Sequence, residues 1–378
     1  MNNEAIELLK QLIEIPSYVD DQQGINETKL VNYIEEWVAN TLTATIEKQP
    51  LGNDRYNLII KKGNPDTLFL AHTDTVAPSD SSQRQAIEKG GEIWGRGASD
   101  MKSGLAALLL AARNNPQANN FWIVLYADEE YDFLGMKGFL KEYPDLKPQR
   151  IISADGSDLQ VGYACRGLIE LRLRVFGKSG HAAKGNGRNA IDATFRLVAI
   201  LKEILDAQTS VELGKTSLNL AYIFGGQKKA DSLQREFLTE VGQAGNIIPD
   251  ICECVIDIRP ANPKVTAQFI QKQLSDIASK NRIEFEVMQI THDYSAWITP
   301  KTDIEKIVPT TNKTAWSDPQ DTGYLDLQMM WQQYDQPSAL MFGGGLGKTG
   351  HSNVERIPIK NYQRTVEFFS TLMEKLCK

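Results

Sequence analysis

The alternation of strand-like and helix-like segments is the feature that most restricts the fold of this chain. Apolar runs at 67–71, 121–127 and 150–154 are typical of buried strands, and segments with helical spacing at 102–113 and 134–143 lie between them. Strands that alternate with helices predict an α/β body with a largely parallel sheet. A chain of 378 residues has room for two or three domains.

The pattern changes after Cys165. Residues 168–176 alternate apolar and polar side chains, as in a strand with one face in solvent. A helix, two strands, a helix and a strand are then expected in this order: 189–205, 217–224, 251–258, 265–279 and 283–290. The order βαββαβ predicts a ferredoxin-like unit. We therefore expect a ferredoxin-like domain at 166–290, inserted into an α/β domain formed by 1–165 and 291–378.

Several classes of protein are disfavoured by composition. The net charge of -7 argues against a general nucleic-acid binder. No segment reaches the roughly 18 apolar residues that a membrane helix needs, and the N-terminus lacks the basic and apolar regions of a secretory signal. The four cysteines form no CxxC pair. We expect a cytoplasmic protein that binds neither nucleic acid nor membrane.

Histidine is scarce, and each of the four can be considered separately: His72, His181, His292 and His351. His72 lies in AHTDT, at the end of an expected strand, where active sites of open α/β sheets lie. In extended chain His72 and Asp74 point to the same side, so Asp74 can orient the ring of a metal-binding His72. A purely structural His–Asp pair is the alternative.

Acidic residues follow two of the expected strands and precede one of the expected helices. Asp100 comes just before the helix at 102–113, Glu129 and Glu130 follow the strand at 121–127, and Asp155 follows the strand at 150–154. Grouped carboxylates are costly unless a metal or solvent compensates their charge. The alternatives are a helix cap for Asp100, a solvated loop for Glu129 and Glu130, and an ordinary turn for Asp155.

Taken together, the order HxD, D, EE, D, H from His72 to His351 resembles the di-zinc hydrolases that include acetylornithine deacetylase, succinyl-diaminopimelate desuccinylase, aminoacylase and glutamate carboxypeptidase. The segments AHTDTV, GRGASDMKSG and DEE carry the resemblance, which covers nearly the whole chain. It implies a zinc-exopeptidase-like catalytic domain with two zinc ions. It also implies that the ferredoxin-like insert is a lid through which the chain forms a homodimer.

The resemblance assigns five metal ligands, with Asp100 bridging both ions. His72 and Asp155 would complete one zinc site, and Glu130 and His351 the other. A tetrahedral set with an open position for water results at each ion. Cobalt or manganese can replace zinc in such sites.

The same resemblance assigns roles to residues that do not bind metal. Glu129 would be the general base, and Asp74 would orient His72. His181, in GKSGHAA, would stabilise the oxyanion, often from the partner subunit of a dimer. Asn246 and Arg259 would bind substrate, since a guanidinium suits a carboxylate. A surface histidine and a structural salt bridge are the alternatives for His181 and Arg259.

These residues predict a metal-dependent hydrolase that cleaves the amide bond of N-acyl amino acids. A di- or tripeptidase or carboxypeptidase with the same metals is the second hypothesis, because Asp155 stands where the deacetylase and desuccinylase branch more often has Glu. A nucleotide-binding loop at 343–350 is excluded, because Phe342 occupies the place of its first glycine. A non-catalytic relative would be expected to have a broken ligand set, and this one is intact.

Overall fold

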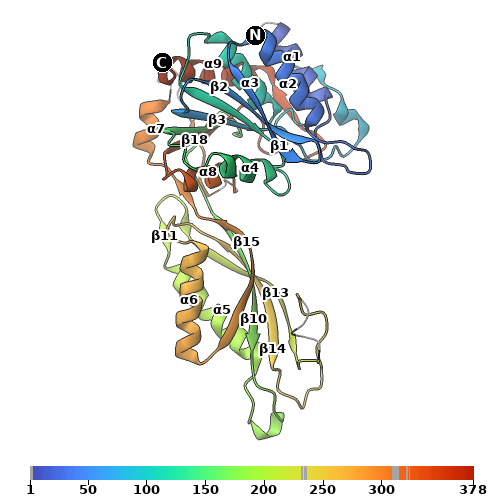
Figure 1. Cartoon of the computed structure of the whole chain (residues 1–378), viewed down its shortest axis with the longest axis vertical. Coiled ribbons are helices and arrows are strands. Elements are labelled where there is room, and N and C mark those ends of the chain that lie inside the picture. The colour runs from blue at the N-terminus through green and yellow to red at the C-terminus, as the bar shows by residue number, and fades with distance from the viewer. Residues whose placement is uncertain (1–2, 231–232, 234–235, 309–314, 321, 323) are drawn as a thin grey trace. The chain divides into compact units, whose positions relative to one another are not determined.

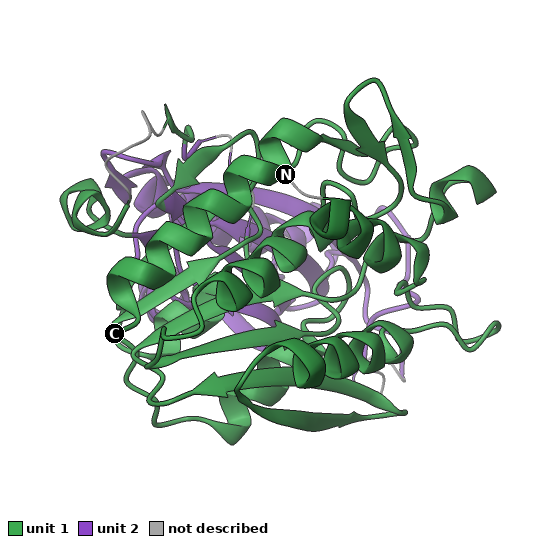
Figure 2. Cartoon of the chain, turned by 90° about the horizontal axis from the view of Figure 1, so that it is seen from above, with its two compact units in different colours: residues 1–163, 299–318, 325–378 green, residues 164–298, 319–324 purple. Residues whose placement is uncertain are grey.

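The computed structural model describes residues 3–230, 233, 236–308, 315–320, 322 and 324–378. The chain forms two compact units, which Figure 2 distinguishes by colour. Unit 1 contains Met1–Tyr163, Thr299–Asp318 and Leu325–Lys378. Unit 2 contains Ala164–Ile298 and Pro319–Tyr324.

Unit 1 is built on an eight-stranded sheet. Its strands lie in the following order: β1 (Thr45–Gly52), β2 (Arg55–Lys62), β6 (Phe121–Tyr126), β3 (Thr67–His72), β7 (Arg150–Ser153), β18 (Ser338–Phe342), β8 (Gln160–Gly162) and β17 (Ala315–Trp316). The four central strands β6, β3, β7 and β18 are mutually parallel. β3 and β6 are buried at every residue, which explains why their sequences are continuously apolar rather than alternating.

Helices cover both faces of this sheet: α1 (Asn3–Glu14), α2 (Thr28–Thr41), α3 (Lys102–Asn114), α4 (Leu134–Glu142), α7 (Lys301–Ile307), α8 (Leu327–Gln333) and α9 (Ile359–Leu376). α3 packs between α1 and α9 on one face, whereas α4 and α8 lie together on the other (Figure 1). α3 is buried from its first turn to Ala112, because it is enclosed by the sheet and its neighbouring helices. Four short elements complete the unit: η1 (Ser81–Arg84), β4 (Ile87–Lys89), β5 (Glu92–Trp94) and β19 (Arg356–Pro358).

Unit 2 has the predicted βαββαβ order. Its six main elements are β10 (Leu168–Phe176), α5 (Ala190–Asp206), β13 (Ser217–Gly226), β14 (Ile251–Arg259), α6 (Ala267–Asn281) and β15 (Glu284–Tyr294). The strands form an antiparallel sheet in the order β13-β14-β10-β15, which is the ferredoxin-like order. Both helices pack on one face, over a core of buried aliphatic side chains. The fold class expected from the sequence, an α/β body with a ferredoxin-like insert, is therefore confirmed.

The insert extends further than the expected 166–290. β9 (Ala164–Cys165) pairs with β16 (Trp297–Ile298), and this small ladder brings both ends of the insert together within unit 2. Its remaining short elements are η2 (Ala182–Lys184), β11 (Thr209–Ser210) and β12 (Gly214–Lys215). Residues Pro319–Tyr324 also belong to this unit. The sequence indicates a helix at 322–333, but α8 begins only at Leu327.

Two features bear on the class of protein. Among the described residues, no helix is long and apolar enough to cross a membrane. All four cysteines are buried and none is in a disulfide bond: Cys165, Cys252, Cys254 and Cys377.

Candidate metal centre

The central sheet of unit 1 brings the candidate ligands to one edge. His72 is the last residue of β3, Glu130 follows β6, and Asp155 follows β7, each at the carboxyl end of its strand. His351 lies in the loop after β18, which is parallel to β7. Because the carboxyl ends of neighbouring parallel strands lie at the same edge, four separate segments contribute side chains to one place.

Asp100 lies just before α3 and contacts both imidazoles. Its Oδ1 is 3.2 Å from His72 Nε2, and its Oδ2 is 3.2 Å from His351 Nε2. The two oxygens of one carboxylate thus face two different histidines. This is the arrangement that a bridging carboxylate requires.

The donor atoms fall into two groups that share Asp100. His72, Asp100 and Asp155 offer ligand atoms within 4.8 Å of one another, and so do Asp100, Glu130 and His351. In the second group, His351 Nε2 lies 2.9 Å from Glu130 Oε1. Ligands around one tetrahedral zinc are separated by roughly 3.3 Å, given bonds of about 2.0–2.1 Å. The residues therefore fit two ions that share one carboxylate.

Asp74 connects the two ligand-bearing strand ends of β3 and β6. Its Oδ1 accepts a hydrogen bond from the backbone N–H of Glu129 at 3.0 Å, and its Oδ2 accepts one from that of Glu130 at 2.9 Å. His72 Nδ1 lies 3.1 Å from the Asp74 carbonyl oxygen. A proton on Nδ1 satisfies this contact and leaves the Nε2 lone pair for a metal.

Burial and mutual repulsion shift the pKa values of the acids. Burial raises the pKa of Asp155 to about 7, with Asp100 contributing, although His72 opposes the shift. Burial likewise raises the pKa of Glu129 well above its ordinary value, and His72 again opposes the shift. Hydrogen bonds to Asp100 and Glu130 raise the pKa of His351 to about 10. The carboxylates outnumber the imidazoles at this edge of the sheet, and two divalent ions would add positive charge.

Two functional candidates were missed from the sequence. Glu355 is buried, and its Oε1 accepts the backbone N–H groups of Ser99 and Asp100, both at 3.0 Å. Its Oε2 accepts a hydrogen bond from Arg96 at 2.5 Å. Glu355 therefore holds the turn that presents Asp100. Its closeness to His351 in the sequence was the only available signal.

Asp326 is the second missed residue. It is buried at the start of α8 and accepts a hydrogen bond from the Tyr126 hydroxyl at 2.9 Å. Its other oxygen has no hydrogen-bond partner among the residues that the structure describes. Burial raises the pKa of Asp326 to about 7, and its charge in turn raises the pKa values of Glu129 and Asp155. No sequence motif marked it, because it follows no predicted strand.

The three candidates outside unit 1 lie at two ends of unit 2. His181 forms an isolated bridge with Ile247, and the Asn246 carbonyl accepts the Ala182 N–H at 2.9 Å, so His181 and Asn246 are neighbours. Arg259 ends β14, whereas Asn246 precedes it, so roughly 25–30 Å of strand separates them. The Arg259 guanidinium pairs with Asp257 at 2.9 and 3.1 Å.

His181 and Asn246 lie at the end of unit 2 that is remote from its chain connections. The chain enters unit 2 at Ala164 and runs the length of β10 before it reaches His181. His181 is exposed, and its Nδ1 accepts the backbone N–H of Ala183 at 3.2 Å. The ring therefore presents Nε2 to the surroundings.

The sequence matches one protein family over most of its length. The model of the peptidase family M20/M25/M40 matches residues 68–375. Acetylornithine deacetylase of Proteus mirabilis is 26% identical, covering 98% of this chain and 96% of that protein. Succinyl-diaminopimelate desuccinylase of Coxiella burnetii is 27% identical, covering 75% of this chain and 76% of that protein.

Solved structures with a similar fold include a member of this family. The crystal structure of an M20 family metallo-carboxypeptidase from Sulfolobus solfataricus superimposes with a TM-score of 0.67 and 16% identity, covering 99% of each chain. A likeness at this identity concerns the fold alone. Because the family model matches 308 residues, the chain belongs to the peptidase family M20/M25/M40 and is a metal-dependent hydrolase of amide bonds.

Proposed function

We propose that this protein hydrolyses the amide bond of N-acyl amino acids at a two-zinc centre. The single observation that carries the proposal is the Asp100 carboxylate, whose two oxygens face two separate imidazoles. Around it, two groups of three donors share that carboxylate. The proposed ligands are His72, Asp100, Glu130, Asp155 and His351.

The donor set supports zinc. Imidazole and carboxylate are both ordinary zinc ligands, and cobalt and manganese accept them as well. Two bound ions would polarise the scissile carbonyl and lower the pKa of the attacking water. The chain's contribution is to hold His72 in one tautomer through Asp74 and to hold Asp100 through Glu355.

Glu129 is proposed as the general base. It lies within 4.8 Å of His72 and Glu130, yet it belongs to neither group that contains Asp100. Its backbone is fixed by Asp74, so its carboxylate is held beside the ligands without being one of them. In this position it would take a proton from the attacking water and deliver it to the leaving amine.

His181 is proposed to stabilise the oxyanion from the partner subunit of a homodimer. The support comes from unit 2 itself, in which His181 lies a full strand length from the points where the chain enters and leaves. An exposed imidazole with a free Nε2 is suited to donate to negative charge that develops in the transition state.

Asn246 and Arg259 are proposed to bind the substrate. Asn246 accompanies His181, so both would reach the same partner site. Arg259 keeps 42% of its side chain exposed while it pairs with Asp257, and this exposed part can bind a substrate carboxylate. The two residues therefore belong to opposite ends of unit 2, and they would contact the substrate from different subunits.

A di- or tripeptidase or carboxypeptidase is the second candidate. An aspartate at position 155, where the deacetylase branch more often has Glu, favours the peptidase. Asp326 favours it too, because it is an additional buried acid whose charge raises the pKa values of Glu129 and Asp155. Together, the six carboxylates of the site carry more negative charge than two divalent ions can balance: Asp74, Asp100, Glu129, Glu130, Asp155 and Asp326. A substrate with a free ammonium group would offset the remainder.

One substrate panel separates the two candidates. Purified protein is incubated with acetyl- and succinyl-amino acids and with di- and tripeptides, with and without chelator. We expect chelator-sensitive release of the acyl group from N-acyl amino acids. Turnover of peptides alone would assign the peptidase role, and turnover that survives complete removal of metal would contradict both.

We place the enzyme in the cytoplasm. The support is that all four cysteines are buried and none is in a disulfide bond, as is typical of a reducing compartment.

A further inference from the structure

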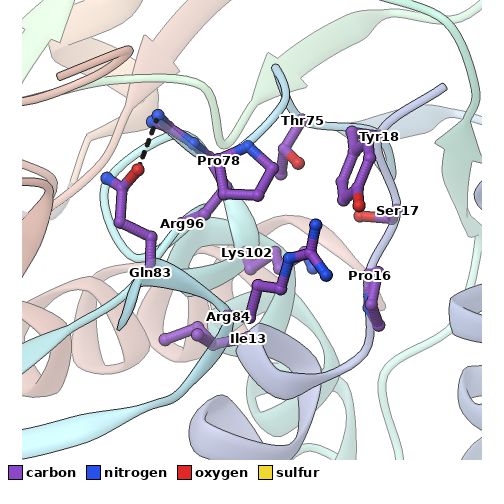
Figure 3. A pocket seen from close by; sticks show the side chains of 10 residues that line it. All are labelled: Ile13, Pro16, Ser17, Tyr18, Thr75, Pro78, Gln83, Arg84, Arg96 and Lys102. Atoms are coloured by element: carbon purple, nitrogen blue, oxygen red, sulfur yellow. Dashed lines mark hydrogen bonds between the residues drawn. The ribbon is translucent and has the colours of Figure 1, made fainter. Parts of the chain in front are cut away.

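Unit 1 contains a small cavity beside the segment that follows α1. It has a volume of about 10 Å³, which suffices for one water molecule or a small ion. Figure 3 shows the side chains that line it, among them Ser17, Tyr18, Arg84, Arg96 and Lys102. None of these five residues belongs to the metal ligands proposed above.

Positive charge dominates the lining of this cavity. Its ten residues include Arg84, Arg96 and Lys102 and no carboxylate. Arg96 is paired with Glu355, and Arg84 is exposed to solvent, whereas the buried Lys102 has no ion pair within the described part of the chain and feels Glu355 and Asp74 only at longer range. A buried cation without a counter-charge is costly, so the cavity favours a negatively charged occupant.

Lys102 is the deepest of these cations. Its side chain is only 2% exposed, and Nζ donates a single hydrogen bond, to the Ile15 carbonyl at 2.8 Å. An ammonium group has three N–H donors. Two of them are left for a ligand in the cavity.

Two hydroxyl groups of the lining have no partner either. Ser17 Oγ and Tyr18 OH are buried and make no hydrogen bond with any residue that the structure describes, and the same holds for Arg96 Nε. Ser17 is fully buried and Tyr18 is 4% exposed. Buried polar atoms are almost always satisfied by protein, water or ligand. All three are donors, as a bound anion requires.

We propose that this cavity binds one small inorganic anion of the size and charge of chloride. A water molecule would satisfy the hydroxyl groups but would leave the buried charge of Lys102 without a direct counter-charge. An anion satisfies the donors and the charge together.

The position of the cavity connects the anion to the metal centre. Lys102 begins α3, directly after the segment that carries Asp100. The Ser17 carbonyl accepts the backbone N–H of Thr75, the residue after Asp74. An anion between Ser17 and Lys102 therefore ties the N-terminal segment to both loops, and it stabilises unit 1 without contacting substrate.

Bromide is the probe for the test. Crystals of the full chain, grown without halide and soaked in sodium bromide, are expected to show a bromine anomalous peak beside Lys102 Nζ and Ser17 Oγ. In solution, sodium chloride should raise the midpoint of thermal unfolding by about 2–4 °C over sodium gluconate of equal ionic strength.

Variants make the test specific. Arg84→Gln and Ser17→Ala should reduce the chloride-dependent shift, and Lys102→Met should abolish it if that variant folds. Lys29→Gln removes an exposed positive charge elsewhere in unit 1 and should leave the shift unchanged. Equal midpoints in chloride and gluconate would overturn the proposal. So would the absence of a bromine peak, or a peak without a chloride-dependent shift, which would mark an adventitious ion only.

Discussion

The metal centre of unit 1 and the His181 end of unit 2 are built in opposite ways. At the metal centre, strand ends converge, and the ligands contact one another: Asp100 touches both imidazoles. At the other end, His181 is exposed: its ring accepts the backbone N–H of Ala183, and its backbone N–H donates to the side chain of Asn186. One site is assembled within its unit, and the other presents its groups outward.

The two sites differ in what holds their side chains in position. In unit 1 the sheet places the ligands, and Asp74 and Glu355 hold their backbones. In unit 2 the His181 ring is exposed among the described residues, and we propose that a second surface completes the site to which it contributes. Our proposal therefore makes unit 1 the seat of metal binding and unit 2 a contributor to the partner's catalysis.

The largest effect is expected from Asp100→Asn. A neutral amide cannot bridge two cations as a carboxylate does, so metal content should fall well below two ions per chain. Loss of the electrostatic contribution of the ions, several kcal/mol, corresponds to about 10⁴-fold in kcat/KM. Metal analysis and steady-state kinetics check both quantities.

Asp132→Asn is the matched control for that change. Asp132 is an exposed acid in the loop that carries Glu130, and among the described residues only its backbone takes part in hydrogen bonds. Its replacement should preserve both metal content and rate. An Asp100→Asn enzyme with two tightly bound ions and full activity would contradict the shared-ligand arrangement.

The second prediction concerns His181 and tests directly whether unit 2 contributes to catalysis in the partner subunit. His181→Ala should lower kcat by about 10²–10³-fold while metal content is unchanged. The Glu129→Ala variant should also retain its metal and lose turnover. If His181 acts on the partner's site, an exchanged mixture of the two inactive variants should recover about a quarter of the wild-type activity, since half of the dimers are mixed and each has one intact site.

Two outcomes would contradict the proposal that His181 acts on the site of the partner subunit. An inactive mixture, despite demonstrated subunit exchange, would place His181 in the site of its own chain. A strictly monomeric and fully active enzyme would exclude action in trans altogether. His292→Ala is the matched control within unit 2, because His292 lies on β15 and has no proposed chemical role; its replacement should leave kcat unchanged.

The two regions also differ in how far the sequence predicts them. The position of the candidate ligands at strand ends could be predicted, because His72, Glu130 and Asp155 each follow an apolar run. Glu355 and Asp326 could not, because their roles depend on long-range contacts with Asp100 and Tyr126. The fold was predictable where periodicity is strong. β1 was missed because it is an edge strand with mixed polarity and a proline, Pro50.

The third prediction uses the pKa shifts of unit 1. In the apoprotein, the pKa of Asp155 is about 7 and that of His351 is about 10. Both groups must be deprotonated to bind metal, so metal and protons compete, and metal affinity should fall as the pH falls. Between pH 8 and pH 6 the expected loss is about 10²–10³-fold. Competition with a chelator of known affinity measures it, and an affinity that does not vary with pH would contradict the assignment of these ligands.

The smallest effect is expected from Glu355→Gln. The glutamine retains one acceptor for the N–H groups of Ser99 and Asp100, but it loses the charge that pairs with Arg96. A positioning residue of this kind acts through the ligand that it holds, and metal affinity should fall about tenfold. The expected signature is a rate that is low at limiting metal and recovers at saturating metal.

Glu92→Gln provides the comparison for Glu355. Glu92 also forms an ion pair, with Arg356 at 3.2 Å, but this pair joins β5 to β19 and not to the turn before α3. Its loss should leave metal affinity unchanged, because a partly exposed pair contributes little. If Glu355→Gln lowers thermal stability but leaves metal affinity intact, Glu355 supports the fold alone. The precision of the metal centre would then come from the sheet without help from the turn before α3.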